Sequence, residues 1–427
     1  MQRKRKGHIL TIVLVALIVA IITVPMVVAS FFLPSEVKVI AGKDHSFNFS
    51  LPLKAKIIMQ NDISIKDFRD EEVKEAAVDL SKPLHVKMDT EGTTNVQLKL
   101  MGIIPLKTVS VQAVKDQKLI PCGEVVGIKV DTQGVLVLGI GEFDATDGVV
   151  SPCKGIVEVG DVILSCNGQK IQTKEEFREC VECANDAQKL KLEISRHGVK
   201  KQVEVTPCFS SMENEYKIGL WIKDSTQGIG TITYINPKSM QFGALGHGIT
   251  DAQTHMLTPV RTGEIMKVFI TRITKGEKGT PGELSGVIDY DNSSKLGTIA
   301  TNKILGVYGK VEEEFKDDQA MGALPIAFQD EVHEGKAVIK VNLTGDKPTE
   351  YEVEIQKVSR FSSEPSKGMI IKIVDKDLLE LTNGIIQGMS GSPIIQDGKL
   401  VGAVTHVFVH DPTRGYGIFI ENMLNTE

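Results

Sequence analysis

The sequence predicts a mainly β chain with a few helices, made of an N-terminal transmembrane helix followed by β-rich domains. An uncharged run of 25 residues extends from Ile9 to Leu33, and short stretches of alternating apolar and polar residues recur along the rest of the chain. With 427 residues the chain exceeds one ordinary domain. The formal net charge of -6 gives no general basic surface, so nucleic acid is not an expected partner.

Residues 1–35 are interpreted as a cytoplasmic basic flank and a membrane anchor. Positions 3 to 6 are all Arg or Lys, and the apolar run that follows is longer than the roughly 20 residues a helix needs to cross a bilayer. The basic flank predicts a cytoplasmic N-terminus, with residues 36–427 outside. A cleavable signal peptide, cut after Val27-Val28-Ala29, is the alternative, although its apolar region would be unusually long.

Six cysteines lie between Cys122 and Cys208. In an exported chain they could form disulfides, but the pairing cannot be read from their spacing. Cys180 and Cys183 have the spacing of half a zinc site, yet no second cysteine or histidine pair accompanies them. We therefore expect core or surface thiols, with no metal and no other cofactor.

Two β regions follow the anchor. Residues 36–114 contain alternations such as Val96 to Leu100, which predict a few strands and no catalytic site. Residues 115–208 show a sharper pattern, in which Thr173 and Glu176 form a capping box that starts a helix. Asn167-Gly168 and His197-Gly198 have the composition of tight turns. The expected strands of this region cover residues 125–130, 134–138, 160–168, 190–194 and 203–205.

This order of elements over residues 115–208 resembles a PDZ domain. In such domains a glycine-containing loop before the second strand binds a peptide's terminal carboxylate, and the strand pairs with the peptide. The resemblance implies a peptide site formed by Ile120, Gly123, Val125 and Val126, although the loop departs from the usual Gly-Leu-Gly-Phe form. A PDZ-like fold that serves only as a spacer is the alternative.

Ser390 lies between glycines in Gly388-Met389-Ser390-Gly391-Ser392, just before a predicted hairpin that turns at Asp397-Gly398. A Gly-x-Ser-Gly loop before a hairpin resembles chymotrypsin-like proteases, in which successive N–H groups face an oxyanion. By this resemblance residues 209–427 form a chymotrypsin-like β-barrel serine protease domain. Ser390 would be the nucleophile, and the N–H groups of Gly388 and Ser390 would form the oxyanion hole. Alone, the motif is weak, since serine and glycine fill many loops.

A serine nucleophile needs a base, and His247 is the best candidate. It is surrounded by glycines in Gly243 to Asp251, which lets the backbone approach closely and leaves the ring open. His406 and His410 stand four apart in a β-branched run, so on a strand they would be about 13 Å apart, too far for a shared metal. We expect His406 to be a packed strand histidine.

Four segments together resemble the SpoIVB peptidases, which are membrane-anchored, PDZ-containing serine proteases of endospore-forming bacteria. These segments are Trp221 to Thr231, Gly243 to Asp251, Leu305 to Lys310, and Gly384 to Ile418. The resemblance implies that His247 is the base and Ser390 the nucleophile. It also implies self-cleavage and cleavage of a membrane-bound regulator of an intramembrane protease, which then activates the late mother-cell sigma factor. The expected location is the space between the membranes around the forespore.

The orienting acid is predicted to be Asp375, which ends an alternating strand 15 residues before Ser390. The family resemblance points to the same residue. Asp289 and Asp291 follow His247 at a plausible spacing, and Asp251 is only four residues from it. A carboxylate at a strand end orients a ring better than one in a polar loop.

Self-cleavage is expected between Pro34 and about Lys115, where an extended chain could enter an active site, and would release the enzyme from its anchor. Two other functions remain open from the residues alone. One is a PDZ-containing binding protein with an inert protease-like domain, and the other is an esterase or transferase that uses the same Ser390 and His247.

Overall fold

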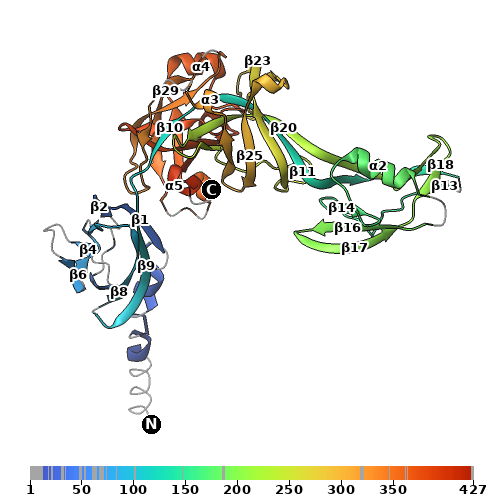
Figure 1. The fold of residues 1–427 in the computed structure, drawn as a ribbon. Helices are drawn as coiled ribbons and strands as arrows, with labels where there is room; N and C mark the ends of the chain where they lie inside the picture. The colour runs from blue at the N-terminus through green and yellow to red at the C-terminus, as the bar shows by residue number, and fades with distance from the viewer. Residues whose placement is uncertain are drawn as a thin grey trace, which may run out of the picture. The chain divides into compact units, whose positions relative to one another are not determined.

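The protein is mainly β, as predicted (Figure 1). The computed structural model describes most of the chain from residue 13 to residue 424. Its described residues are 13–17, 19–20, 23–29, 33, 35–47, 51, 54–59, 65–66, 72–73, 75–82, 84–100, 102–146, 148–184, 188–317, 322–345, 347–360, 362 and 364–424. The chain divides into two compact units, each described here by itself.

The N-terminal unit consists of the chain up to Lys118 together with two later segments, Pro325–His333 and Ser359–Ser363. Its strands form a five-stranded sheet in the order β1-β9-β8-β3-β6 and a four-stranded sheet in the order β2-β7-β4-β5. The described strands are β1 (Glu36–Ile40), β2 (Asp44–Phe47), β3 (Lys54–Met59), β4 (Ile65–Lys66), β5 (Glu72–Val73), β6 (Glu75–Asp79), β7 (Leu84–Lys87), β8 (Gly92–Leu100) and β9 (Ile104–Val114). This region therefore contains more regular structure than the few strands predicted.

The N-terminal apolar segment is helical at residues 13–17 and 23–29. No helix among the residues that the structure describes is long and apolar enough to cross a membrane. The predicted transmembrane segment, residues 9–33, includes positions 9–12, 18, 21–22 and 30–32, which lie outside the described residues.

The second unit contains two closed β-barrels. In the first barrel, β11, β22, β25, β26, β21 and β20 pair in turn, and β20 pairs back with β11. Its elements are β10 (Lys118–Pro121), β11 (Val125–Ile140), β20 (Leu220–Ile235), β21 (Gln241–Ala244), β22 (Val260–Met266), β25 (Lys295–Lys303), β26 (Gly306–Val311), α3 (Glu313–Asp317) and β27 (Leu324–Pro325). A hairpin of β23 (Val268–Thr274) and β24 (Glu283–Ile288), followed by the 3-10 turn η1 (Asn292–Ser294), separates β22 from β25.

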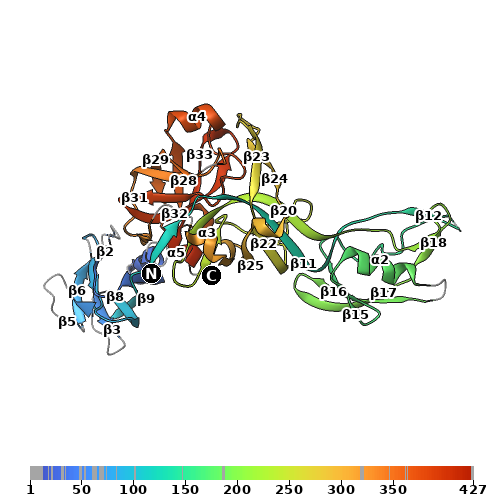
Figure 2. The same ribbon diagram turned by 45° about the horizontal axis from the view of Figure 1, so that its top comes forward.

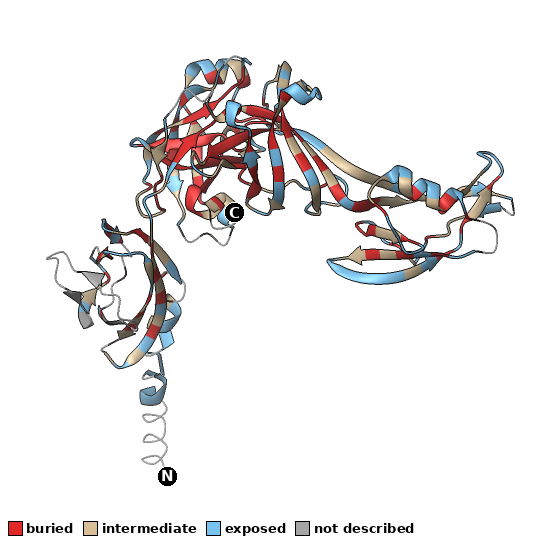
Figure 3. Ribbon diagram, viewed as in Figure 1, coloured by how far each residue is buried: buried red, intermediate tan, exposed pale blue. Residues whose placement is uncertain are grey.

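The second barrel closes in the order β28-β29-β30-β33-β32-β31. Its elements are β28 (Gly335–Val341), β29 (Thr349–Val358), the 3-10 turn η2 (Pro365–Lys367), β30 (Met369–Ile373), α4 (Lys376–Thr382), β31 (Pro393–Gln396), β32 (Lys399–Phe408), β33 (Asp411–Phe419) and α5 (Ile420–Leu424). The predicted turn between β31 and β32 is confirmed, because Asp397 and Gly398 both adopt positive φ angles, of 50° and 71°. Along the barrel strands buried residues alternate with partly buried and exposed ones, and β31 is buried throughout (Figure 3).

Residues 135–222 form a PDZ-like lobe with its own core around Ile163, Phe177 and Leu192. The predicted capping box of Thr173 and Glu176 is confirmed at the start of α2. A disulfide joins Cys166 on β14 to Cys180 on α2, a pairing that the spacing could not show. The lobe's remaining elements are β12 (Phe143–Ala145), β13 (Gly148–Val150), β14 (Val162–Cys166), β15 (Gln169–Lys170), α2 (Lys174–Glu182), β16 (Leu190–Arg196), β17 (Val199–Val205), β18 (Cys208–Ser210) and β19 (Glu215–Lys217).

Strand β11 corrects the prediction of two strands over 125–130 and 134–138. It is one strand with a register shift between Asp131 and Leu136. Its first half pairs with β22 and β20 in the first barrel, and its second half pairs with β14 in the PDZ-like lobe. The two long strands β11 and β20 run side by side from the lobe into the barrel (Figures 1 and 2). The lobe is therefore an insertion within the first barrel.

The structure places the predicted peptide-binding set in the first barrel, outside the PDZ-like lobe. Ile120, Val125 and Val126 are buried in the first barrel, not in the PDZ-like lobe. The backbone of Gly123 is also occupied, because its N–H donates to Ile232 O at 2.9 Å and its carbonyl accepts from Asn342 N–H at 2.9 Å. Backbone groups already paired within a barrel leave no strand edge for a peptide.

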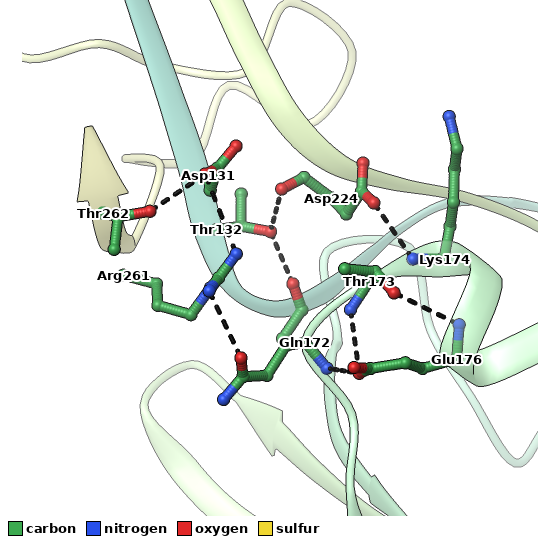
Figure 4. Close-up of polar contacts among 10 residues, drawn as sticks. Asp131, Thr132, Gln172, Thr173, Lys174, Glu176, Asp224, Arg261 and Thr262 are labelled. Atoms are coloured by element: carbon green, nitrogen blue, oxygen red, sulfur yellow. Dashed lines mark hydrogen bonds and ion pairs between the residues drawn. The ribbon is translucent and has the colours of Figure 1, made fainter. Parts of the chain in front are cut away.

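A polar junction joins the PDZ-like lobe to the first barrel (Figure 4). The Arg261 guanidinium donates to Gln172 Oε1 at 3.2 Å and lies 3.7 Å from an Asp131 carboxylate oxygen. At the start of α2, Lys174 N–H donates to Asp224 Oδ2 at 3.0 Å. Asp224 stands on β20, so the helix of the lobe is bonded directly to a strand that continues into the barrel.

Candidate active site

His247 and Ser390 line one cleft of about 800 Å³. His247 follows β21 of the first barrel, and Ser390 precedes β31 of the second barrel. The cleft walls include Thr226 to Ile229 of β20 and Thr405 to Val407 of β32. The structure therefore brings together the nucleophile and base predicted from the sequence.

Glycines shape the Ser390 loop, which we define as residues 387–391. Gly388 and Gly391 have φ angles of +101° and +97°, which favour glycine. A Cβ atom on Gly391 would lie 2.0 Å from Thr231 O, so the loop sits tightly against β20. Buried Thr231 on β20 makes two hydrogen bonds to the loop. Its hydroxyl donates to Gly388 O at 2.7 Å, and its N–H donates to Ser390 O at 3.0 Å.

The predicted oxyanion donors are free in this loop. Neither the Gly388 N–H nor the Ser390 N–H donates a hydrogen bond to any group among the described residues. The Gly388 carbonyl is occupied by Thr231 and thus directed away from a substrate. Both N–H groups remain available to an oxygen that develops negative charge, which is what an oxyanion hole requires.

His247 is oriented by its own neighbour in the chain. Its Nδ1 lies 3.0 Å from the Gly248 carbonyl oxygen. A carbonyl only accepts hydrogen bonds, so Nδ1 carries the proton and Nε2 is left with the lone pair that a general base needs. Burial lowers the pKa of His247 below its ordinary value, and the hydrogen bond to Gly248 opposes that shift.

The Ser390 hydroxyl is engaged elsewhere in this structure. It donates to the Thr405 carbonyl oxygen at 2.8 Å. Nucleophilic attack requires this hydroxyl to leave Thr405 and hydrogen-bond to the imidazole of His247 instead. Catalytic hydrogen bonds commonly form only when substrate is bound.

His406 belongs to the cleft, which the sequence did not reveal. It stands on a strand as expected, but its ring centroid lies 5.2 Å from that of His247 and it lines the cleft. Although His406 is exposed as a whole residue, loss of water around the ring and, to a smaller extent, nearby His247 lower its pKa to about 4. His406 is therefore neutral at neutral pH and adds no charge beside the base.

Asp375 is not brought together with His247 and Ser390. It is the N-cap of α4 and accepts hydrogen bonds from Leu378 N–H at 3.0 Å and Glu352 N–H at 3.2 Å. No hydrogen bond joins it to His247 among the described residues. The sequence signal that selected it, a polar residue at a strand end, is also the signal of a helix cap.

The other candidate acids also serve local structure. Buried Asp251 accepts hydrogen bonds from Gln253 N–H and Thr254 N–H, both at 3.0 Å. Asp289 accepts from the Ser294 hydroxyl at 2.5 Å, and Asp291 lies outside the cleft. Of the described residues that line the cleft, none is an aspartate or glutamate. Within the described part of the chain, no group of three or more His, Cys, Asp or Glu residues could hold a metal ion.

Two β-barrels that carry a histidine after one strand and a Gly-x-Ser-Gly loop before another have the arrangement of a serine peptidase. Residues 214–424 match the family model of the SpoIVB peptidases, peptidase family S55, and over these residues the chain belongs to that family. The family suggested by the sequence motifs is thereby confirmed. The protein is a serine peptidase, and its substrates are peptides or proteins.

Several solved structures are similar to parts of the chain. The PDZ domain of an SdrC-like protein from Listeria monocytogenes is 17% identical, with 22% of this chain and 90% of that chain covered and a TM-score of 0.19. The Rv3671c protease in its inactive form is 14% identical, with 46% and 81% covered and a TM-score of 0.25. The HtrA-type protease AlgW with a decapeptide is 11% identical, with 48% and 53% covered and a TM-score of 0.27. The comparison with curated proteins gives no match.

Proposed function

We propose that this protein is a sporulation serine endopeptidase in which Ser390 is the nucleophile and His247 the general base. The observation that supports this most directly is that both residues line one cleft beside the free N–H groups of Gly388 and Ser390. Asp375 is proposed as the orienting acid on the family resemblance alone.

The chemistry follows from these positions. Ser390 Oγ attacks the carbonyl carbon of the scissile peptide bond while Nε2 of His247 takes the hydroxyl proton. The carbonyl oxygen becomes negative and accepts hydrogen bonds from Gly388 N–H and Ser390 N–H. The imidazolium then gives its proton to the leaving amine, and the acyl group stays on Ser390 until water, deprotonated by His247, releases it as a carboxylate.

The proposed substrates are the chain itself and a membrane-bound regulator of an intramembrane protease. Cleavage of that regulator would release the protease to activate the late mother-cell sigma factor. This rests on membership of the SpoIVB peptidase family over residues 214–424. The PDZ-like lobe is proposed to select or restrain substrates, because its described residues include no nucleophile with a partner base.

The proposed location is the space between the two membranes around the forespore, with an anchor in residues 9–33 and the N-terminus in the cytoplasm. The uncharged run and its basic flank support this, as do the side chains of Val13, Leu14 and Leu17, each more than half exposed. When the protein is produced in vegetative cells, whose plasma membrane faces the exterior, external protease should degrade residues 36–427 in intact protoplasts. Protection of the whole chain would refute the topology.

Ser390→Ala and His247→Ala test the mechanism. Each should abolish peptide hydrolysis and self-cleavage without changing Tm, and the double variant should be no worse than either single one because the residues act as a unit. Near-normal turnover by a single variant would contradict the assignment. A folded wild-type protein that a fluorophosphonate probe leaves unlabelled would instead favour the inert binding protein. Hydrolysis of small esters but of no protein would favour the esterase.

A further inference from the structure

The β23–β24 hairpin leaves the first barrel between two strands that are already neighbours. β22 and β25 pair from Gly263 with Ile299 to Met266 with Lys295, so a short turn would connect them. The chain instead extends through residues 267–294, where β23 and β24 pair with each other as a two-stranded sheet. A two-stranded hairpin is marginally stable by itself. Contacts with the rest of the unit must therefore hold it in place.

One such contact is with the Ser390 loop. Leu284 N–H donates to Gln387 O at 2.9 Å, and Gln387 N–H donates to Gly282 O at 2.8 Å. Glu283 and Gln387 form a parallel β-bridge through this exchange. Gln387 directly precedes Gly388, so the hairpin fixes the backbone at the point where the oxyanion donors begin.

The Leu284 side chain also supports Gly388 from one side. It is 7% exposed, and a Cβ atom added to Gly388 would lie 2.8 Å from its Cδ1 atom. The Thr231 hydroxyl donates to the Gly388 carbonyl at 2.7 Å. Gly388 is therefore held by one apolar side chain from the hairpin and by one hydroxyl from β20.

The tip of the hairpin is anchored to the second barrel at two more places. Gly279 N–H donates to Val409 O at 2.7 Å. Gly276 N–H donates to Thr382 O at 2.9 Å, and the Asn383 side-chain amide donates to Gly276 O at 2.6 Å. The hairpin thus bridges the end of α4 and the loop after β32, and it does not depend on the Gln387 contact alone.

We propose that the β23–β24 hairpin is a positioning element for the oxyanion hole, and that Leu284 is the side chain through which it acts. The inference rests on the proposed function, because it assumes that Gly388 and Ser390 bind the oxyanion. An N–H group stabilises developing charge only when it is held close to the required position. Loosening Gln387 and Gly388 therefore lowers kcat, while substrate binding elsewhere in the cleft is preserved.

The test compares Leu284→Ala with Val287→Ala, a truncation of an exposed apolar residue on the same strand. Turnover of a fluorogenic peptide is measured together with the affinity for a peptide aldehyde, whose adduct with Ser390 places its oxygen in the oxyanion hole. Leu284→Ala should lower kcat and aldehyde affinity by about 10- to 100-fold, since complete removal of a donor costs about 10² to 10³. KM should stay within about twofold. Val287→Ala should match wild type in all three values.

Asn383→Gly provides a second variant if Leu284→Ala does not fold. Asn383 has a φ angle of 56°, which glycine tolerates. The change therefore removes the hydrogen bond from the Asn383 side-chain amide to Gly276 O without straining the end of α4. Like Leu284→Ala, Asn383→Gly should lower kcat. Wild-type kcat in a folded Leu284→Ala or Asn383→Gly protein, or a change confined to KM, would overturn the proposal. Retained turnover by Ser390→Ala would instead remove the proposed function on which it depends.

Discussion

His247, the proposed base, is held by a backbone carbonyl instead of a carboxylate. The Gly248 carbonyl sets the tautomer of His247. It carries no negative charge, so it stabilises the imidazolium less than an aspartate would. Asp375, the proposed charged partner, makes no hydrogen bond to the ring among the described residues.

The pH profile of kcat/KM should report the pKa of His247. Burial lowers the pKa of His247 below the ordinary 6.5, so its ring stays neutral at pH values where an exposed histidine is partly protonated. Activity needs the neutral ring and is lost as pH falls through the lowered pKa. We expect the acid limb of kcat/KM to lie below pH 6.5. A limb above that value would show that the ring is not desolvated in solution.

Asp375→Asn separates the two roles available to Asp375. Asparagine caps a helix about as well as aspartate, so α4 should be preserved, with a small drop in Tm because the amide keeps only one of the two acceptor oxygens that bind Leu378 N–H and Glu352 N–H. If Asp375 orients His247, as the family resemblance implies, turnover should fall by a factor on the order of 10⁴. Asp289→Asn is the matched control and should cost little. Near-normal turnover by Asp375→Asn would leave helix capping as the role of this residue.

At the scale of secondary-structure elements, α2 connects the PDZ-like lobe to the cleft through the polar junction. The helix start is bonded to Asp224 on β20, and residues 226 to 229 of the same strand line the cleft. A peptide that displaces α2 would thus act on a cleft wall through one continuous strand.

Arg261→Ala should weaken this coupling while sparing the barrel. The change removes the bond to Gln172 and the ion pair with Asp131. A bond of this kind contributes about 1 kcal/mol, so the rate of self-cleavage relative to small-peptide hydrolysis should shift roughly fivefold. Lys295→Ala removes a cation of the same barrel that pairs with Glu264 and should leave the ratio unchanged. Equal ratios for both variants would argue against coupling through the junction.

Local signals in the sequence were sufficient for the capping box, the Ser390 loop and several turns. The turns Asn167-Gly168, His197-Gly198 and Asp397-Gly398 all adopt positive φ angles. Long-range pairing was not predictable. Asp131-Thr132-Gln133 has the composition of a turn, yet β11 continues through these residues as an irregular stretch because it pairs with β20 and β22. Nothing near Leu284 indicates that it contacts Gln387, about 100 residues later in the chain.

At the scale of the whole molecule, the insertion of the PDZ-like lobe changes how its role must be tested. Deleting residues 115–208 would remove β10 and β11 and open the first barrel. Val130 pairs with Thr226 and Asp131 with Ser225, so joining Asp131 to Ser225 through an Asn-Gly turn should form a two-residue hairpin and keep the ring closed.

This shortened protein should fold and hydrolyse small peptides, but with altered self-cleavage and substrate choice. The measurement is a comparison of Tm, peptide turnover and self-cleaved termini with those of wild type. If a folded shortened protein behaved like wild type in self-cleavage and in substrate choice, the lobe would be a spacer.

The register shift in β11 has a mechanical consequence. Two-stranded ribbons twist more than wider sheets, and a bulge increases the twist locally. The ribbon of β11 and β20 is irregular between Asp131 and Leu136, immediately beside the cleft-lining residues 226 to 229. Torque applied to the lobe would therefore act as rotation at this point, next to the cleft wall formed by residues 226 to 229.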